Sequence, residues 1–296
     1  MHDTLTTITL VVLTCLAGAL SIVAIASLRR RASGGASQGV LWGLITIGCG
    51  ALFIYRTLFV YESWQPLAAH VDGLLMLATL FGAAVLFLHS ASRLPGSAAF
   101  AGPLMVLLLL WAVCASRWTL VAFRIETIVK SVHLATVYLG TLFFAVAAIA
   151  GAVFLHSQHR LRHKAAPAGR TPFASLESIE RLIIHSSALG LALLTIGLIT
   201  GLVIVSRQRE ADPTWWINWK LVLTLTAWLI YAAVMNVRFA TAFRGARAAW
   251  LSIAGVALLL ATFGVSSALP SKKAPAEESA PTINESAVPP TSGGVR

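Results

Sequence analysis

Eight long apolar runs restrict the fold of this sequence more than any other feature. A helix needs about 20 largely apolar residues to cross the hydrocarbon core of a bilayer. Runs of about this length cover residues 7–28, 40–60, 71–90, 98–115, 132–156, 182–205, 219–237 and 250–268. Short connections between them contain most of the charged residues. We therefore predict an all-α fold, a polytopic membrane helical bundle of about eight transmembrane helices within residues 1–269.

The composition agrees with a membrane protein. Hydrophobic residues make up 57% of the chain and charged residues only 11%, whereas soluble domains carry about 25% charged residues. The net charge of +11 does not indicate nucleic-acid binding, because the charges lie in connections between apolar runs, where they set membrane topology. The first run is longer than the core of about 7–15 residues in a signal peptide, and arginines follow it, so we interpret it as a span.

The distribution of Lys and Arg predicts the orientation. One set of connections contains twelve of them: Arg29, Arg30, Arg31, Arg93, Arg160, Arg162, Lys164, Arg170, Arg181, Arg238, Arg244 and Arg247. The opposite set contains five: Arg117, Arg124, Lys130, Arg207 and Arg209. The richer set should be cytoplasmic, which places both termini outside. The last segment, 270–296, lacks the apolar content to pack, and we expect it to be a disordered extracytoplasmic tail.

Three tryptophans, Trp215, Trp216 and Trp219, fall within five residues just before the seventh apolar run. Such a cluster is typical of a membrane-interface belt, but it could also form a stacking surface for a flat ligand. Trp64 and Trp118 fall at the same, predicted outer, face. Interface anchoring alone predicts aromatic residues at both faces. The bias towards one face therefore favours an outer-face site.

Two histidines are candidate ligands at the predicted outer ends of helices. His133 opens a long apolar helix, and His70 precedes Asp72 at the start of another. An ionisable side chain placed deeper than the interface needs a partner, so either residue could instead make a satisfied polar contact. The histidines at 156, 159 and 163 are interleaved with Arg and Lys, and a solvated basic connection explains them better than a metal site.

Several motifs resemble one family over residues 56–265. They are QPL at 65–67, HVDGLL at 70–75, LESIERL at 176–182, GLALLTIG at 190–197 followed by Gly201, AWLIYA at 227–232, FRGARA at 243–248 and GV at 264–265. Together they resemble the CcsA/HemX-type cytochrome c assembly proteins, a haem-handling membrane family that includes CcsA/ResC and YpjD-like branches. The resemblance covers most of the predicted membrane region.

The resemblance implies a haem site at the outer face. In that family the tryptophan-rich segment handles haem and outer histidines ligate its iron. It therefore implies that Trp215, Trp216, Asn218, Trp219, Lys220 and Trp228 contact haem, with His133 and His70 as iron ligands. A porphyrin offers an apolar face for indole stacking, and its iron accepts imidazole nitrogen. The five cations of the outer connections are candidates for pairing with the propionates.

The sequence also departs from the family pattern. The full tryptophan-rich core reads W-x-W-D-P-K-E, whereas here Asn218 stands in place of the aspartate and Leu221 in place of the glutamate. Asn236 replaces a membrane histidine, and no second outer histidine follows residues 264–265. We therefore consider His70 a replacement ligand. These departures resemble the HemX/YpjD-type branch more than a full haem-lyase subunit.

Three functions remain open at this stage. The first is a component of cytochrome c biogenesis in a bacterial cytoplasmic (inner) membrane, which presents haem at the outer face to apocytochrome c with a ResB/CcsB-like partner. The second is a HemX/YpjD-type accessory or regulatory protein without lyase activity, and the third is a small-molecule transporter. We assign no catalytic residue, because no phosphate-binding glycine loop, nucleophile elbow or paired carboxylates occur. At most the chain is one subunit of a haem lyase.

Overall fold

The computed structural model describes residues 2–30, 36–60, 70–90, 96–116, 128–162, 175–207, 219–235 and 245–268. This part of the chain folds into eight α-helices and one π-helical segment. They are α1 (His2–Arg30), α2 (Ala36–Tyr55), η1 (Arg56–Val60), α3 (His70–Ser90), α4 (Ser97–Ser116), α5 (Ile128–Arg162), α6 (Leu176–Arg207), α7 (Trp219–Met235) and α8 (Ala246–Ala268). Each predicted apolar run coincides with one helix, or with α2 continued by η1. The all-α prediction is confirmed.

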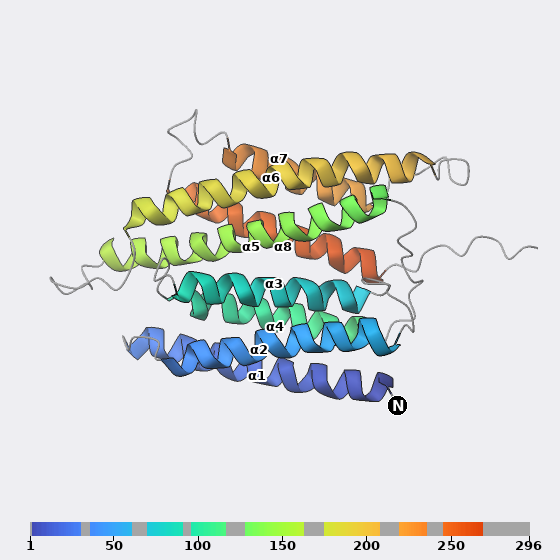
Figure 1. Cartoon of the computed structure of the whole chain (residues 1–296). Helices are drawn as coiled ribbons and strands as arrows, with labels where there is room; N and C mark the ends of the chain where they lie inside the picture. The colour runs from blue at the N-terminus through green and yellow to red at the C-terminus, as the bar shows by residue number, and fades with distance from the viewer. Residues whose placement is uncertain are drawn as a thin grey trace, which may run out of the picture.

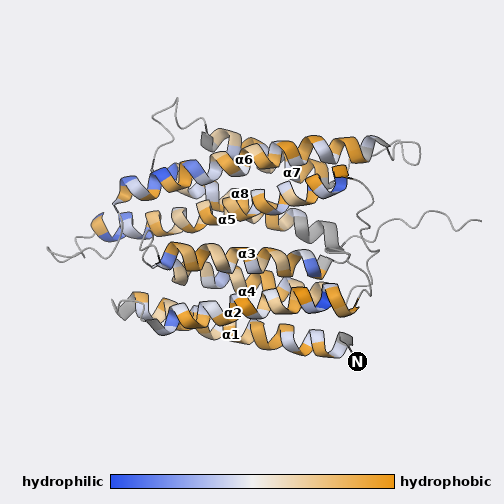
Figure 2. Cartoon of the chain, in the orientation of Figure 1, coloured by the Kyte–Doolittle hydropathy of each residue, from blue (hydrophilic) through white to orange (hydrophobic). Residues whose placement is uncertain are grey.

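The helices have the length and composition of membrane spans. Six of those described are long and apolar enough to cross a bilayer: Thr4–Leu28, Ser37–Val60, Val71–Ser90, Ser97–Ser116, Ile128–Arg162 and Leu176–Ile204. The apolar stretches of α7 and α8, Leu221–Ala233 and Ala246–Thr262, are shorter. Figure 2 shows apolar residues along the middle of the helices and hydrophilic residues mostly near their ends. The architecture is that of a polytopic helical membrane protein.

The helices form two groups that are joined by α5. In the first helix group (α1–α4), α1 packs on α2 and α4, and α3 packs on α2 and α4. In the second helix group (α5–α8), α5 packs on α6 and α8, and α7 packs on the same two helices. Helix α5 also contacts α3 and α4, so it joins the groups (Figure 1).

Successive helices run in opposite directions (Figure 1). The starts of α3, α5 and α7 therefore lie at one end of the molecule, which we call the His133 end. The end of α5 and the starts of α4, α6 and α8 lie at the opposite end, which we call the His156 end. This alternation is the one that the sequence-based topology assumes.

Many large apolar side chains lie on the outside of the structure. Ile22 is 71% exposed, Ile47 69% and Ile128 82%. Lipid tails are as apolar as the protein interior, so apolar side chains that face lipid in a bilayer carry no penalty for exposure. The position of Cys15, Cys49 and Cys114 inside apolar runs predicts three buried, small hydrophobic side chains. Cys49 is buried, but the prediction is wrong for Cys15 and Cys114, which are exposed on the outside of their helices.

Glycines allow α5 and α6 to approach closely. A Cβ added at Gly140 would lie 3.4 Å from the carbonyl oxygen of Gly190, and one at Gly197 would lie 3.0 Å from Cγ2 of Val137. A Cβ at Gly190 would lie 2.6 Å from the ring of Phe144. Small residues at helix interfaces let backbones come together where no hydrophobic effect drives association. The tight contacts at Gly190 and Gly197 show that the glycines of α6 allow its close approach to α5.

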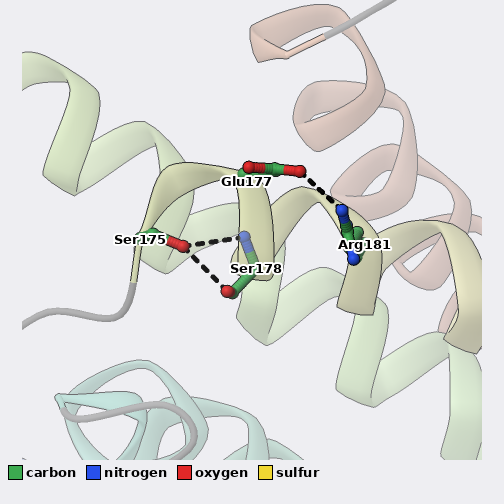
Figure 3. A network of polar contacts seen from close by, with 4 residues as sticks. All are labelled: Ser175, Glu177, Ser178 and Arg181. Atoms are coloured by element: carbon green, nitrogen blue, oxygen red, sulfur yellow. Dashed lines mark hydrogen bonds and ion pairs between the residues drawn. The ribbon is translucent and has the colours of Figure 1, made fainter.

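Helix α6 begins with a side-chain cap (Figure 3). The hydroxyl of Ser175 accepts a hydrogen bond from the backbone N–H of Ser178 at 3.2 Å, which satisfies a donor that the first turn leaves without a partner. Arg181 and Glu177 form an exposed ion pair, with Nη2 and Oε1 2.6 Å apart. The cap therefore starts α6 before the apolar run at 182–205 begins.

Glycines in a left-handed conformation precede α4 and α8. Gly96 has a φ of 84° and Gly245 a φ of 70°, which a residue without Cβ adopts readily. Their carbonyls accept the first helical hydrogen bonds, from Ala99 and Ala249, each at 3.2 Å. The backbone N–H of Gly245 donates to Glu180 at 3.4 Å, which ties the start of α8 to α6.

Candidate functional site

His133 lies in the second turn of α5, half-buried, with its ring against α6. Its Nδ1 is 2.8 Å from the carbonyl oxygen of Gly197 and 3.3 Å from the hydroxyl of Thr200. A carbonyl oxygen can only accept, so Nδ1 carries the proton and donates to it. The neutral ring then keeps Nε2 unprotonated, which is the form in which imidazole binds a metal. The contact also orients the ring.

A glycine notch on α6 receives this ring. A Cβ at Gly201 would lie 2.9 Å from Cε1 and 3.3 Å from Nδ1 of His133. Gly197, one turn earlier, provides the carbonyl that binds Nδ1. Sequence reasoning included both glycines in a family motif but did not assign them this contact. The small-xxx-small spacing of Gly197 and Gly201 was the available signal, because it marks a face where another helix comes close.

Trp228 is held on a different side of α6. Its Nε1 donates to the hydroxyl of Thr195 at 2.9 Å, and that hydroxyl donates to the carbonyl of Leu191. Residues two apart on a helix project about 200° from one another. Thr195 and Gly197 therefore face nearly opposite ways. The structure does not bring Trp228 to His133, although both bind α6.

Tyr231, in the same motif as Trp228, fixes α7 to its neighbours. Its buried ring stacks on Phe144 of α5, with centroids 3.4 Å apart and planes inclined by 15°. Its hydroxyl donates to the carbonyl of Ser252 in α8 at 3.2 Å. A Cβ at Gly255 would lie 2.6 Å from this ring. The recognisable AWLIYA segment thus contains a packing residue that sequence reasoning did not single out.

A buried ion pair joins η1 to α3, within the first helix group, at the His133 end. Nε of Arg56 in η1 is 2.6 Å from Oδ1 of Asp72 in α3, and the side chains are only 8% and 0% exposed. Gly73 leaves the space that the hydroxyl of Tyr138, on α5, occupies. Charged groups in membrane segments are stable when they are paired in this way. Tyr138 lies on the same helix as His133, so this cluster connects α3 to the helix with the candidate ligand.

The backbone brings other predicted residues to this end. His70 is the first residue of α3, and Trp219 and Lys220 begin α7. The side chains of these three residues lie outside what the structure describes, and Trp215, Trp216 and Asn218 fall outside the described residues altogether. Among the predicted haem-site residues, His133 and Trp228 are those with described side chains. The roles of the others stay predictions.

The remaining described histidines behave differently. His185 lies exposed on α6, and its Nδ1 contacts the carbonyl of Arg181 on the same helix at 2.7 Å. The position of His185 one turn inside the sixth apolar run predicts a polar contact within the bundle. That prediction is wrong, because the side chain bonds to its own backbone on the outside. Within the described ranges, no three His, Cys, Asp or Glu side chains gather to hold a metal ion. An iron held by a porphyrin needs only one or two such ligands.

Residues 67–271 match the profile of a family described as "Cytochrome C assembly protein". This match covers more than half of the chain and includes every helix from α3 to α8. The chain belongs to the cytochrome c assembly protein family. The resemblance predicted from the sequence motifs is thereby confirmed.

Named relatives agree over shorter stretches. The chain is 34% identical over 87 residues to the cytochrome c biogenesis protein CcsA of Synechococcus sp. (strain RCC307), which covers 29% of this chain and 27% of that protein. It is 36% identical over 90 residues to the inner membrane protein YpjD of Escherichia coli (strain K12), which covers 30% of this chain and 33% of YpjD. The chain thus aligns with about a third or less of the length of these relatives. No solved structure matches it.

Proposed function

We propose that this protein is an inner-membrane component of cytochrome c biogenesis that binds haem at the His133 end and presents it to apocytochrome c. Family membership and the similarity to CcsA support the pathway. Similarity to a protein named as inner membrane, together with the apolar helices, supports the location. The family gives the transporter expectation no support.

The observation that carries the haem proposal is the orientation of His133. Its Nδ1–H bond to the Gly197 carbonyl leaves Nε2 as the metal-binding nitrogen. The tryptophan-rich segment enters α7, which begins at the same end of the bundle. Haem is the cargo here, and the chemistry is formation of thioether bonds between its vinyl groups and the thiols of apocytochrome. The contribution of this chain is to hold and orient haem, with His133 and His70 as iron ligands.

The test is haem binding by the purified membrane protein, measured by absorption spectroscopy and a pyridine haemochrome assay after expression with ample haem. We expect His133→Ala to lose or strongly shift the Soret band. His185→Ala is the matched control, because this histidine is exposed and bonds to its own helix. An unchanged Soret band in His133→Ala would refute the ligand assignment.

The topology is part of this proposal and has its own test. We propose that the His133 end and both termini face the periplasm, because the arginine-rich connections lie at the other end. Alkaline phosphatase fused after residue 296 should then be active, and a fluorescent protein fused there should be dark. The opposite pattern would show that the proposed orientation is wrong and that the haem site does not lie at the outer face.

A second function is favoured by specific residues. Asn218, Leu221 and Asn236 replace residues of the full family motif, and YpjD is among the similar proteins. The second proposal is a YpjD-like accessory protein that acts through partners and does not attach haem. A purified protein without haem, and deletion cells that still mature c-type cytochromes, would favour it. Co-purification of a ResB/CcsB-like membrane protein with haem would favour the first proposal.

A further inference from the structure

A groove of about 650 Å³ lies where α1 and α4 of the first helix group face α5 and α8 of the second. Its walls are apolar side chains, among them Leu28, Leu104 and Leu260. His156 is the ionisable residue in its lining. The groove has the volume of a small-molecule site, commonly about 300–1,000 Å³. The groove lies between apolar membrane-spanning helices, so a ligand that fills it must be largely apolar.

Small residues and a proline shape the groove. Ala152 of α5 and Ala257 of α8 leave room that larger side chains would fill. Pro103 lies inside α4 and lines the groove together with Ala99, one turn earlier. Proline has no N–H, so it cannot donate the usual helical hydrogen bond to the carbonyl of Ala99.

Basic side chains gather at one end of this groove. The half-buried ring of His156 lies against Phe100, with centroids 5.8 Å apart. Arg160 follows His156 by four residues, so both lie on the same face of α5, about 6 Å apart along its axis. Helix α1 also ends at this end of the molecule. An apolar groove that leads to basic side chains complements a ligand with an apolar body and an anionic head.

We propose that this groove binds one anionic phospholipid from the surrounding bilayer. Its acyl chains lie against the apolar walls formed by α1, α4, α5 and α8. Its phosphate is held by Arg160 and His156 at the mouth of the groove. Basic pockets between transmembrane helices recognise anionic headgroups through charge. The site lies at the His156 end, so it is separate from the candidate haem site at His133.

The experiment compares lipids on the whole protein. The protein is purified in mild detergent, and binding of phosphatidylglycerol and of phosphatidylcholine is measured by native mass spectrometry. We expect phosphatidylglycerol to bind roughly fivefold more tightly, the effect of about one cation near a headgroup. Arg160→Gln should remove this preference, because it weakens the binding of phosphatidylglycerol more than that of phosphatidylcholine, which carries a phosphate but no net charge. Arg162→Gln is the matched control, because it removes the same charge two residues further along α5 and should keep the preference.

A second variant tests the groove itself. Ala257→Leu should weaken both lipids, because its side chain fills the space for the acyl chains. Equal binding of the two lipids to the unaltered protein would overturn the proposal, as would a preference that survives Arg160→Gln. Loss of haem or of a co-purifying membrane protein from Ala257→Leu, with lipid binding unchanged, would assign the groove to that occupant and also overturn it. If Ala257→Leu does not fold, the Arg160→Gln and Arg162→Gln comparison still decides.

Discussion

Gly201→Ala should weaken haem binding although it changes no candidate ligand. The added Cβ would lie 2.9 Å from Cε1 of His133, whereas ordinary contact begins at 3.4 Å, so the ring must move by about 0.5 Å. Gly197 and Gly201 lie one turn apart on the same face of α6, so this movement carries the ring away from both. The Nδ1–carbonyl distance would grow from 2.8 Å to about 3.3 Å, beyond the usual range of about 2.7–3.2 Å.

The expected magnitude follows from the loss of that bond. A net contribution of about 0.5–1.5 kcal/mol corresponds to a loss of haem affinity of roughly 2- to 10-fold. Spectroscopic titration of the purified apoprotein with haem measures this change. Gly140→Ala is the matched control on the same interface, because its Cβ would meet its nearest neighbour at 3.4 Å, an ordinary contact. Unchanged affinity in Gly201→Ala, at unchanged thermal stability, would refute the notch as the device that orients His133.

Three further predictions concern stability, measured as thermal unfolding in detergent. Asp72→Asn leaves Arg56 buried without its counter-charge and should lower the free energy of unfolding by about 3–5 kcal/mol. Adding Arg56→Gln should recover part of that loss. If the effects of the two substitutions simply add, the ion pair does not stabilise the fold. Trp228→Phe should lower the free energy of unfolding by about 1 kcal/mol, because it removes the hydrogen bond to Thr195. Adding Thr195→Val to this variant should then lower it little further. A further loss of similar size would show that the hydrogen bond is not the cause. Glu177→Gln should change the free energy of unfolding by less than about 1 kcal/mol, because its ion pair with Arg181 is exposed. A larger loss would show that this exposed ion pair does stabilise the fold.

The helices could be predicted from the sequence because the bilayer sets their length. An apolar run of about 20 residues has few alternatives to a transmembrane helix. The boundaries differ most for α5 and α6, where polar turns extend the helix beyond the apolar run. Ser175 explains one of these extensions, because its cap starts α6 six residues before the apolar run at 182.

Helix neighbours could not be predicted in the same way. Lipid and protein surfaces are equally apolar, so hydrophobic patterning does not say which face of a helix meets another helix. The exposed positions of Cys15 and Cys114 illustrate this, since an apolar run gives no sign of which residues face lipid. The partner of Asp72 was also missed, although the charge of Arg56 near a helix end was a visible signal for it.

The candidate site was predicted in its residue types but not in its contacts. His133 stood out because an ionisable residue near the start of an apolar helix is unusual. Its bond to Gly197 joins residues 64 positions apart, and no local pattern encodes such a pairing. The structure explains Trp228 as a residue bound to Thr195, on another side of α6 from His133. The roles of Trp215, Trp216, Trp219, Asn218, Lys220 and His70 remain predictions from the family resemblance.

The sharing of α5 between the two helix groups has a consequence for synthesis. Chains emerge N-terminus first, and units whose contacts are local can assemble before the rest is made. The contacts of α1 with α2 and α4 are complete once α4 has entered the membrane. Helix α5, in contrast, must wait for α8, the last helix, to complete its packing. We therefore expect α1–α4 to assemble before His133 of α5 meets the glycine notch of α6, and α7 and α8 to pack last.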